Sequence, residues 1–126
     1  MRFAGARQKV LAHNVANITT PNFQAKDVSV SGFQAQLRDA IERRKEKGPG
    51  TSLRLESTAE VEQSESGDLR VEAKTQIDGI LGHDRNVRNL ETTMQAVVEN
   101  ATAFRVATDL LRSRYQLLSA AISERA

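Results

Sequence analysis

Histidine and its acidic neighbours are the first residues to consider for chemistry, and this 126-residue chain has only two histidines, His13 and His83. His83 directly precedes Asp84, a pair in which a carboxylate can orient an imidazole base or share a metal ion. The alternative is a polar helix entry that Asp84 caps, and the pattern favours this alternative. His13 stands beside Asn14 in an expected helix, as a surface or interface polar group. The sequence therefore predicts no catalytic residue, no metal site and no cofactor.

Other reactive patterns are missing from the sequence. The chain has no cysteine, which excludes disulfides, thiolate metal ligands and a cysteine nucleophile. It has no phosphate-binding loop, dinucleotide fingerprint, zinc spacing or nucleophile elbow. The basic run 43–47 could contact phosphate, but the net charge is only +2 and no aromatic residue interleaves with the run. We interpret it as a solvated helix end and expect neither catalysis nor nucleic-acid binding.

A polar cluster near the start of the chain requires an explanation. Asn14 and Asn17 stand three positions apart, on one ridge of a helix expected over residues 3–18. Asparagine lowers helix propensity, so these amides should have partners, either backbone in the following turn or a neighbouring chain. Pro21 ends the helix because it lacks an amide hydrogen and disfavours helical backbone before it. Asn22 suits a turn that contains a left-handed residue.

The strongest periodic signal is an apolar stripe towards the C-terminus, which steps by three and four residues over five heptads. No glycine or proline interrupts residues 87–122, so we expect one helix over 84–122, begun by Asp84 or Asn86. At about 1.5 Å per residue, the stripe is about 54 Å long. We call this stripe the seam, and it comprises Val87, Leu90, Met94, Val97, Ala101, Phe104, Thr108, Leu111, Tyr115, Leu118 and Ile122.

The seam is longer than anything expected to cover it. The helix over 3–18 has less than half its length. In one interpretation a third helix over 32–46, capped by Ser31, covers the remainder in a monomeric three-helix bundle. In the other, further chains cover the seam and the folded state is an assembly, because an exposed apolar stripe drives association. The strictness of the repeat favours the second interpretation.

The segment between these helices is less regular. Gly48-Pro49-Gly50 interrupts the chain after the third helix. Apolar residues alternate with polar ones at 53–55 and 69–73, which predicts a hairpin around the polar stretch 57–68. Because that stretch has little to bury, we expect part of it to be disordered. We see no secretory signal and no transmembrane segment.

Residues 11–25 read Leu-Ala-His-Asn-Val-Ala-Asn-Ile-Thr-Thr-Pro-Asn-Phe-Gln-Ala, which resembles the N-terminal signature of bacterial flagellar rod and hook proteins. The usual form has Asn-Ile-Ala-Asn and then Thr-Pro-Gly-Tyr. Asn22 replaces the glycine, and asparagine tolerates the left-handed conformation that glycine supplies. Near the other end, 83–86, Glu99-Asn100 and 110–115 resemble the proximal rod subunits of this family, although Arg85 stands where glycine is usual.

The resemblance implies a structural role without catalysis, as a subunit of the flagellar proximal rod in the basal body. Such subunits are exported unfolded through the flagellar type III apparatus and polymerise in the periplasm through their terminal helices, around the export channel. The partners implied are other copies of the chain, neighbouring rod proteins, the adaptor between rod and membrane ring, and the export apparatus. The residues implied as an assembly motif, together with the seam, are Asn14, Asn17, Thr20, Pro21, Asn22 and Phe23.

The expected fold is mainly α, with long N- and C-terminal helices that pair like a coiled coil. Residues 1–25 and 84–126 would form this axial assembly domain. Residues 26–83 would form a variable middle segment with a short helix, a hairpin and partial disorder. The alternative function is a helical adaptor or export chaperone, which would use the same seam to bind a partner helix without polymerising.

Overall fold

A computed structural model describes residues 1–48, 50–75 and 85–124, with the side chains of 85–89 outside this description. The fold is mainly α, as expected. The helices are α1 (Arg2–Ala16), α2 (Val30–Lys47) and α3 (Arg85–Ser123), and four short strands lie in the middle of the chain. The strands are β1 (Lys26–Asp27), β2 (Val61–Gln63), β3 (Leu69–Val71) and β4 (Lys74–Thr75). No described helix is both long enough and apolar enough to span a membrane.

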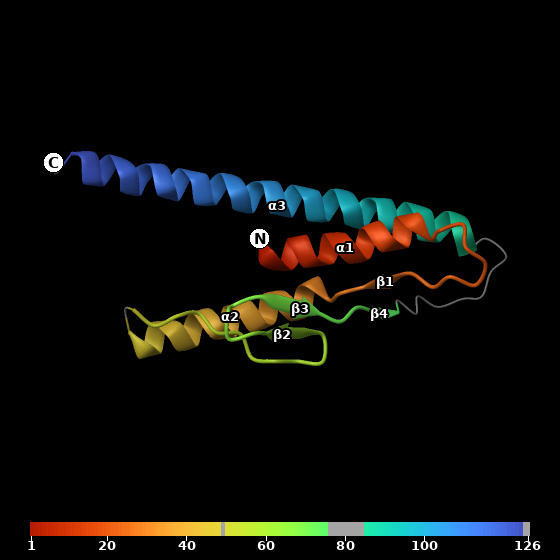
Figure 1. The fold of residues 1–126 in the computed structure, drawn as a ribbon, viewed down its shortest axis with the longest axis horizontal. Coiled ribbons are helices and arrows are strands. Elements are labelled where there is room, and N and C mark those ends of the chain that lie inside the picture. The colour runs from red at the N-terminus through yellow and green to blue at the C-terminus, as the bar shows by residue number, and fades with distance from the viewer. Residues whose placement is uncertain (49, 76–84, 125–126) are drawn as a thin grey trace.

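The molecule is elongated, and α1 lies between α3 on one side and the middle segment on the other (Figure 1). α1 and α3 run in opposite directions, so the start of α1 lies beside the middle of α3 (Figure 1). The 15 residues of α1 pack along part of the 39-residue α3, and the C-terminal half of α3 extends beyond α1.

The small core joins α1 to the middle segment. Its buried members are Phe3, Val28 and Val61, and partly buried residues such as Phe33 pack around them. The rings of Phe3 and Phe33 stack with centroids 3.9 Å apart, which fixes the start of α2 against the start of α1. The face of α1 that points away from α3 therefore packs against the middle segment of the same chain.

The strands form two antiparallel pairs. Lys26 of β1 pairs with Thr75 of β4, and Val61 of β2 pairs with Val71 of β3. The expected hairpin is therefore present, but its first strand is not at 53–55. That strand is β2, inside the polar stretch 57–68 that we expected to be partly disordered. The expectation was wrong because Val61 is buried in the core, so the stretch does have an apolar anchor.

The helix boundaries agree with the sequence to within two residues, but one cap was misassigned. α2 begins at Val30 because the hydroxyl oxygen of Ser29, and not that of Ser31, accepts the Gly32 backbone N–H at 3.0 Å. Ser31 lies inside the first turn. Three of the basic residues of 43–47 occupy the last turn of α2, where positive charge interacts favourably with the helix dipole: Arg44, Lys45 and Lys47. Gly48 follows with φ 86°, a conformation that glycine adopts without strain.

Candidate assembly interface

Asn14 connects the end of α1 to the first strand. Its side-chain N–H donates to the Lys26 carbonyl at 2.6 Å, and its side-chain oxygen accepts the Lys26 backbone N–H at 3.1 Å. The amide thus satisfies both backbone groups of one residue, as a neighbouring strand would. Asn14 is buried. Its partner is backbone of the same chain, but it lies in β1 and not, as the sequence had suggested, in the turn that follows α1.

The other members of the assembly motif form the turn itself. The Asn17 side chain donates to the His13 carbonyl at 2.9 Å, and its backbone caps the helix. Asn22 has φ 60°, which confirms the expected left-handed residue. The Phe23 ring lies 5.7 Å from the His13 ring. Thr20 and Pro21 are exposed, so in the isolated chain the motif builds a turn whose tip faces solvent.

A buried ion pair, which sequence reasoning missed, lies beside this turn. Arg7 donates from Nε and Nη2 to the two carboxylate oxygens of Asp27, at 2.8 and 2.5 Å. Both side chains are less than one tenth exposed. The Asp27 hydrogen bond raises the pKa of Arg7 against the effect of burial, and Glu99 of α3 adds to the rise. One sequence signal could have indicated that Arg7 is buried. It stands in the 3-7-10-14 spacing of the face of α1 that packs on the strands.

A second polar contact, also missed, joins α1 to α3. The buried Asn100 side chain donates to the Ala4 carbonyl at 2.9 Å and to the Gln8 side-chain oxygen at 2.8 Å. Asn100 immediately precedes the seam residue Ala101. The only sequence signal was its place in the Glu99-Asn100 pair of the family resemblance, which gave it no role.

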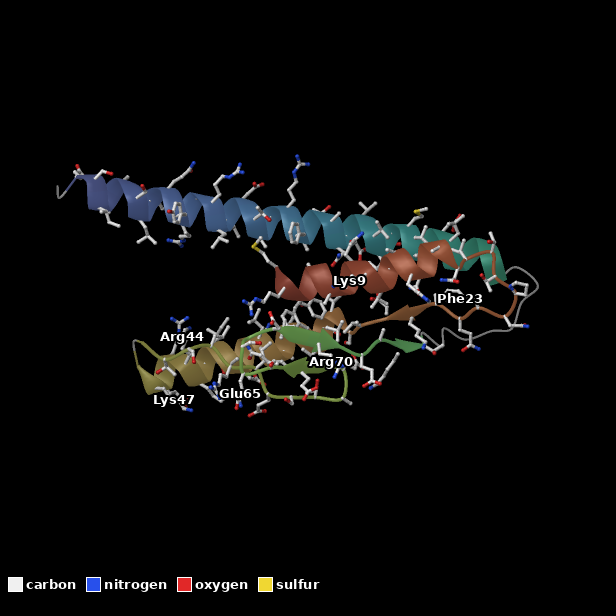
Figure 2. All side chains as sticks on the ribbon, viewed as in Figure 1. Lys9, Phe23, Arg44, Lys47, Glu65 and Arg70 are labelled. Carbon is white, nitrogen blue, oxygen red and sulfur yellow. The ribbon has the colours of Figure 1, made fainter. Side chains whose placement is uncertain are left out.

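Most of the seam is left uncovered by the residues that the structure describes, including the seam residues beside α1. Val97 and Thr108 are half-buried, whereas Phe104 is 42% exposed and Tyr115 is 74% exposed. All described residues from 109 to 124 are exposed, and their side chains project freely (Figure 2). α2 therefore does not cover the remainder of the seam, which disfavours the monomeric three-helix bundle. The other exposed seam residues are Leu90, Met94, Ala101, Leu111, Leu118 and Ile122.

α3 also exposes large apolar side chains outside the seam, on other faces of the helix. Stepping by heptads does not select these four residues: Val98, Val106, Leu110 and Leu117. Among the sequence candidates, His83 and Asp84 lie outside the described residues, as does the side chain of Val87. The described residues contain no cluster of three or more His, Cys, Asp or Glu side chains that could hold a metal ion.

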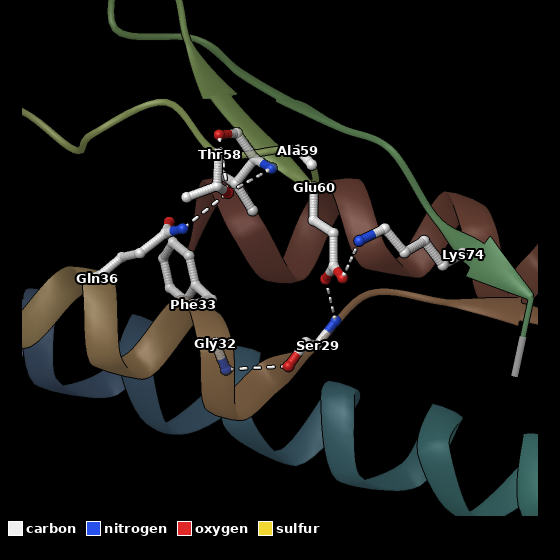
Figure 3. Close-up of a pocket in the computed structure, with 9 residues that line it drawn as sticks. Ser29, Gly32, Phe33, Gln36, Thr58, Ala59, Glu60 and Lys74 are labelled. Atoms are coloured by element: carbon white, nitrogen blue, oxygen red, sulfur yellow. Dashed lines mark hydrogen bonds and ion pairs between the residues drawn. The ribbon is translucent and has the colours of Figure 1, made fainter.

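A shallow hollow of about 230 Å³ lies where α2 meets β2 and β4 (Figure 3). Its walls are tied together by hydrogen bonds, including Gln36 Nε2 to Thr58 Oγ1 at 2.7 Å. Glu60 accepts the Ser29 backbone N–H at 3.1 Å and pairs with Lys74 at 3.0 Å. Lys74 and the Ser29 N–H lower the pKa of Glu60. These contacts fasten the hairpin to α2 and place no nucleophile beside a base.

Comparison with known proteins gives relatives of one kind. The chain is 40% identical to the flagellar basal body rod protein FlgB of Yersinia enterocolitica over 58 residues, 46% of the chain and 40% of the relative. It is 28% identical to the FlgB of Borrelia hermsii over 119 residues, 92% of the chain and 84% of the relative. The FlgB of Salmonella typhimurium is also 28% identical, over 86% of the chain and 76% of the relative.

The chain is therefore similar in sequence to FlgB proteins along most of its length. No family model matches it. The alignments with the two Yersinia relatives span only 40% and 34% of those proteins, whereas the more distant relatives align over most of the chain. These relatives agree with the resemblance seen in the sequence, and each of them is named a flagellar basal body rod protein.

Proposed function

We propose that the chain is a structural subunit of the flagellar proximal rod, and that it polymerises through α1 and α3 around the export channel. One observation carries this proposal: the C-terminal half of α3 extends beyond α1 with its seam side chains exposed. Its partners are further copies of the chain, neighbouring rod proteins and the adaptor that joins the rod to the membrane ring.

The exposed seam supplies a driving force for assembly. Burying one large apolar side chain contributes about 1.5–3 kcal/mol. Large contiguous apolar patches are uncommon on the surface of a monomer. Four exposed seam residues lie in the C-terminal half of α3, beyond α1: Leu111, Tyr115, Leu118 and Ile122. A neighbouring helix that covers the stripe would bury them, since a heptad repeat matches the geometry of helix pairing.

The same fold suits export in an unfolded state. The buried apolar residues of the described chain are few, so the isolated subunit has a modest free energy of unfolding. They are Phe3, Leu11, Val28, Ala40 and Val61. We therefore propose that the chain passes the type III export apparatus unfolded and becomes fully stable only in the periplasmic rod, where neighbours cover α3.

Mass spectrometry of basal bodies purified from the source bacterium tests this function. We expect the chain among the minor rod components. Its absence from intact rods, together with abundance in the cytoplasm, would contradict the proposal and favour the adaptor or export-chaperone alternative.

A further inference from the structure

Asn100 makes a buried polar contact in the interface between α3 and α1. Asn100 is 4% exposed, and both acceptors of its side-chain N–H group, the Ala4 carbonyl and Gln8 Oε1, belong to α1. Gln8 is the only one of these two acceptors that is a side chain, so the contact with Gln8 depends on where α1 lies along α3. Thr93, one heptad before Asn100, is also buried but has no amide.

Apolar packing alone would not fix that position. α3 is more than twice as long as α1. Apart from Asn100, the described residues of α3 that are buried or half-buried are small, so their packing distinguishes only weakly between registers one heptad, about 10 Å, apart: Thr93, Ala96, Val97, Ala107 and Thr108. The positions seven residues away from Asn100 are Thr93 and Ala107, and neither carries an amide that could replace it. In a register shifted by one heptad, Met1 or Val15 would take the place of Gln8, and neither side chain carries an oxygen that could accept the Asn100 N–H.

An electrostatic interaction between Glu99 of α3 and Arg7 of α1 also affects the register of the two helices. Glu99 lies close enough to Arg7 to raise its pKa, which favours the observed register. Arg7, however, already makes two hydrogen bonds with Asp27 of β1, so Glu99 is not its principal partner. Asn100 is the described residue of α3 whose side chain hydrogen-bonds directly to α1.

We propose that Asn100 is a positioning residue, which fixes the register of α1 on α3 and thereby the length of α3 that remains uncovered. A single buried asparagine can specify register in paired helices at some cost in stability. The register itself belongs to the isolated subunit. Only its consequence for assembly, through the length of free seam, rests on the proposed function.

Distances between two spin labels measure the register directly. The chain has no cysteine, so Lys9→Cys and Arg112→Cys, both at exposed positions, attach one label to each helix. Labelled protein is diluted in unlabelled protein so that only distances within one chain are recorded. With Asn100 present, we expect one narrow distance. With Asn100→Leu, we expect a second population, shifted by up to about 10 Å, the length of one heptad.

Thr102→Leu is the matched control, because Thr102 is exposed on α3 and bonds only to Val98 of its own helix. It should keep the single distance. One unchanged distance in a helical Asn100→Leu variant would overturn the proposal. So would loss of helix on Asn100→Leu, because an apolar replacement should preserve the packing and change only its register. Neither result depends on whether the chain is found in rods, so failure here is distinguishable from failure of the proposed function.

Discussion

Arg7 of α1 and Asp27 of β1 form a bidentate ion pair in which both side chains are almost completely buried. Asp27 also accepts the Val28 backbone N–H at 2.7 Å, so its carboxylate binds both the Arg7 side chain and the backbone just after β1. Together with Asn14 and Lys26, this pair fastens the middle segment to the N-terminal helix. The expected division between an assembly domain at 1–25 and 84–126 and a middle segment at 26–83 stays a prediction, and these contacts cross its first boundary.

Breaking the buried pair should destabilise the fold strongly. We predict that Asp27→Ala lowers the free energy of unfolding by about 3–5 kcal/mol, because it leaves the Arg7 charge buried without a partner. Urea unfolding followed by circular dichroism measures this loss. Asp39→Ala, at an exposed position on α2, is the control and should cost little. A cost below about 1 kcal/mol for Asp27→Ala would contradict the prediction, because it would mean that water solvates the Arg7 charge in place of Asp27.

Asn14 and Asn17 of the assembly motif should differ in their effect on stability, although the side chains of both make hydrogen bonds. Asn14→Ala leaves the Lys26 N–H and carbonyl unpaired, and we predict a cost of about 1–3 kcal/mol. Asn17→Ala removes one exposed hydrogen bond and should cost less than about 1 kcal/mol. Hydrogen exchange at the Lys26 amide provides a local measurement, and it should become much faster only in Asn14→Ala. Equal protection in both variants would contradict the strand-like role of Asn14.

Glu60 should make part of the stability depend on pH. Its pKa is lower in the folded chain than in the unfolded one because of Lys74 and the Ser29 N–H. A carboxylate of this kind stabilises the fold above its unfolded pKa, and the contribution is lost as the pH falls through the folded pKa. We predict that Glu60→Gln destabilises the chain at pH 7 and has a smaller effect in acid, below both pKa values. An equal effect at both pH values would rule out the ionised side chain as the cause.

The long periodic elements were predictable from sequence because their signals are local. The spacing of the seam residues predicted α3, and Pro21 with Asn22 predicted the turn after α1. The first strand of the hairpin was not predictable, because Val61 becomes a strand residue only through its contact with a core that Phe3 supplies from 58 residues away. The Ser29 cap was missed because both serines satisfy the same local rule.

The polar contacts of α1 were hidden for a related reason. Arg7, Asn14 and Asn100 are residue types usually found on surfaces. Their burial depends on partners that are distant in sequence, Asp27, Lys26 and Ala4. The spacing of Arg7 within an apolar face was a usable signal, whereas nothing local marked Asn100. The other exposed apolar side chains of α3 were missed because heptad stepping selects one stripe of the helix and ignores its other faces.

The most direct test of the central claim places a charge in the uncovered half of the seam and measures incorporation into the rod. Leu118→Asp alters an exposed seam residue, and Gln116→Asp puts the same charge on the same helix outside the seam. Both should leave the isolated subunit helical. In basal bodies purified from cells that express each variant, we predict the Gln116→Asp chain at the wild-type level and little or no Leu118→Asp chain. Wild-type incorporation of Leu118→Asp would contradict the claim that the exposed seam of α3 is the assembly surface.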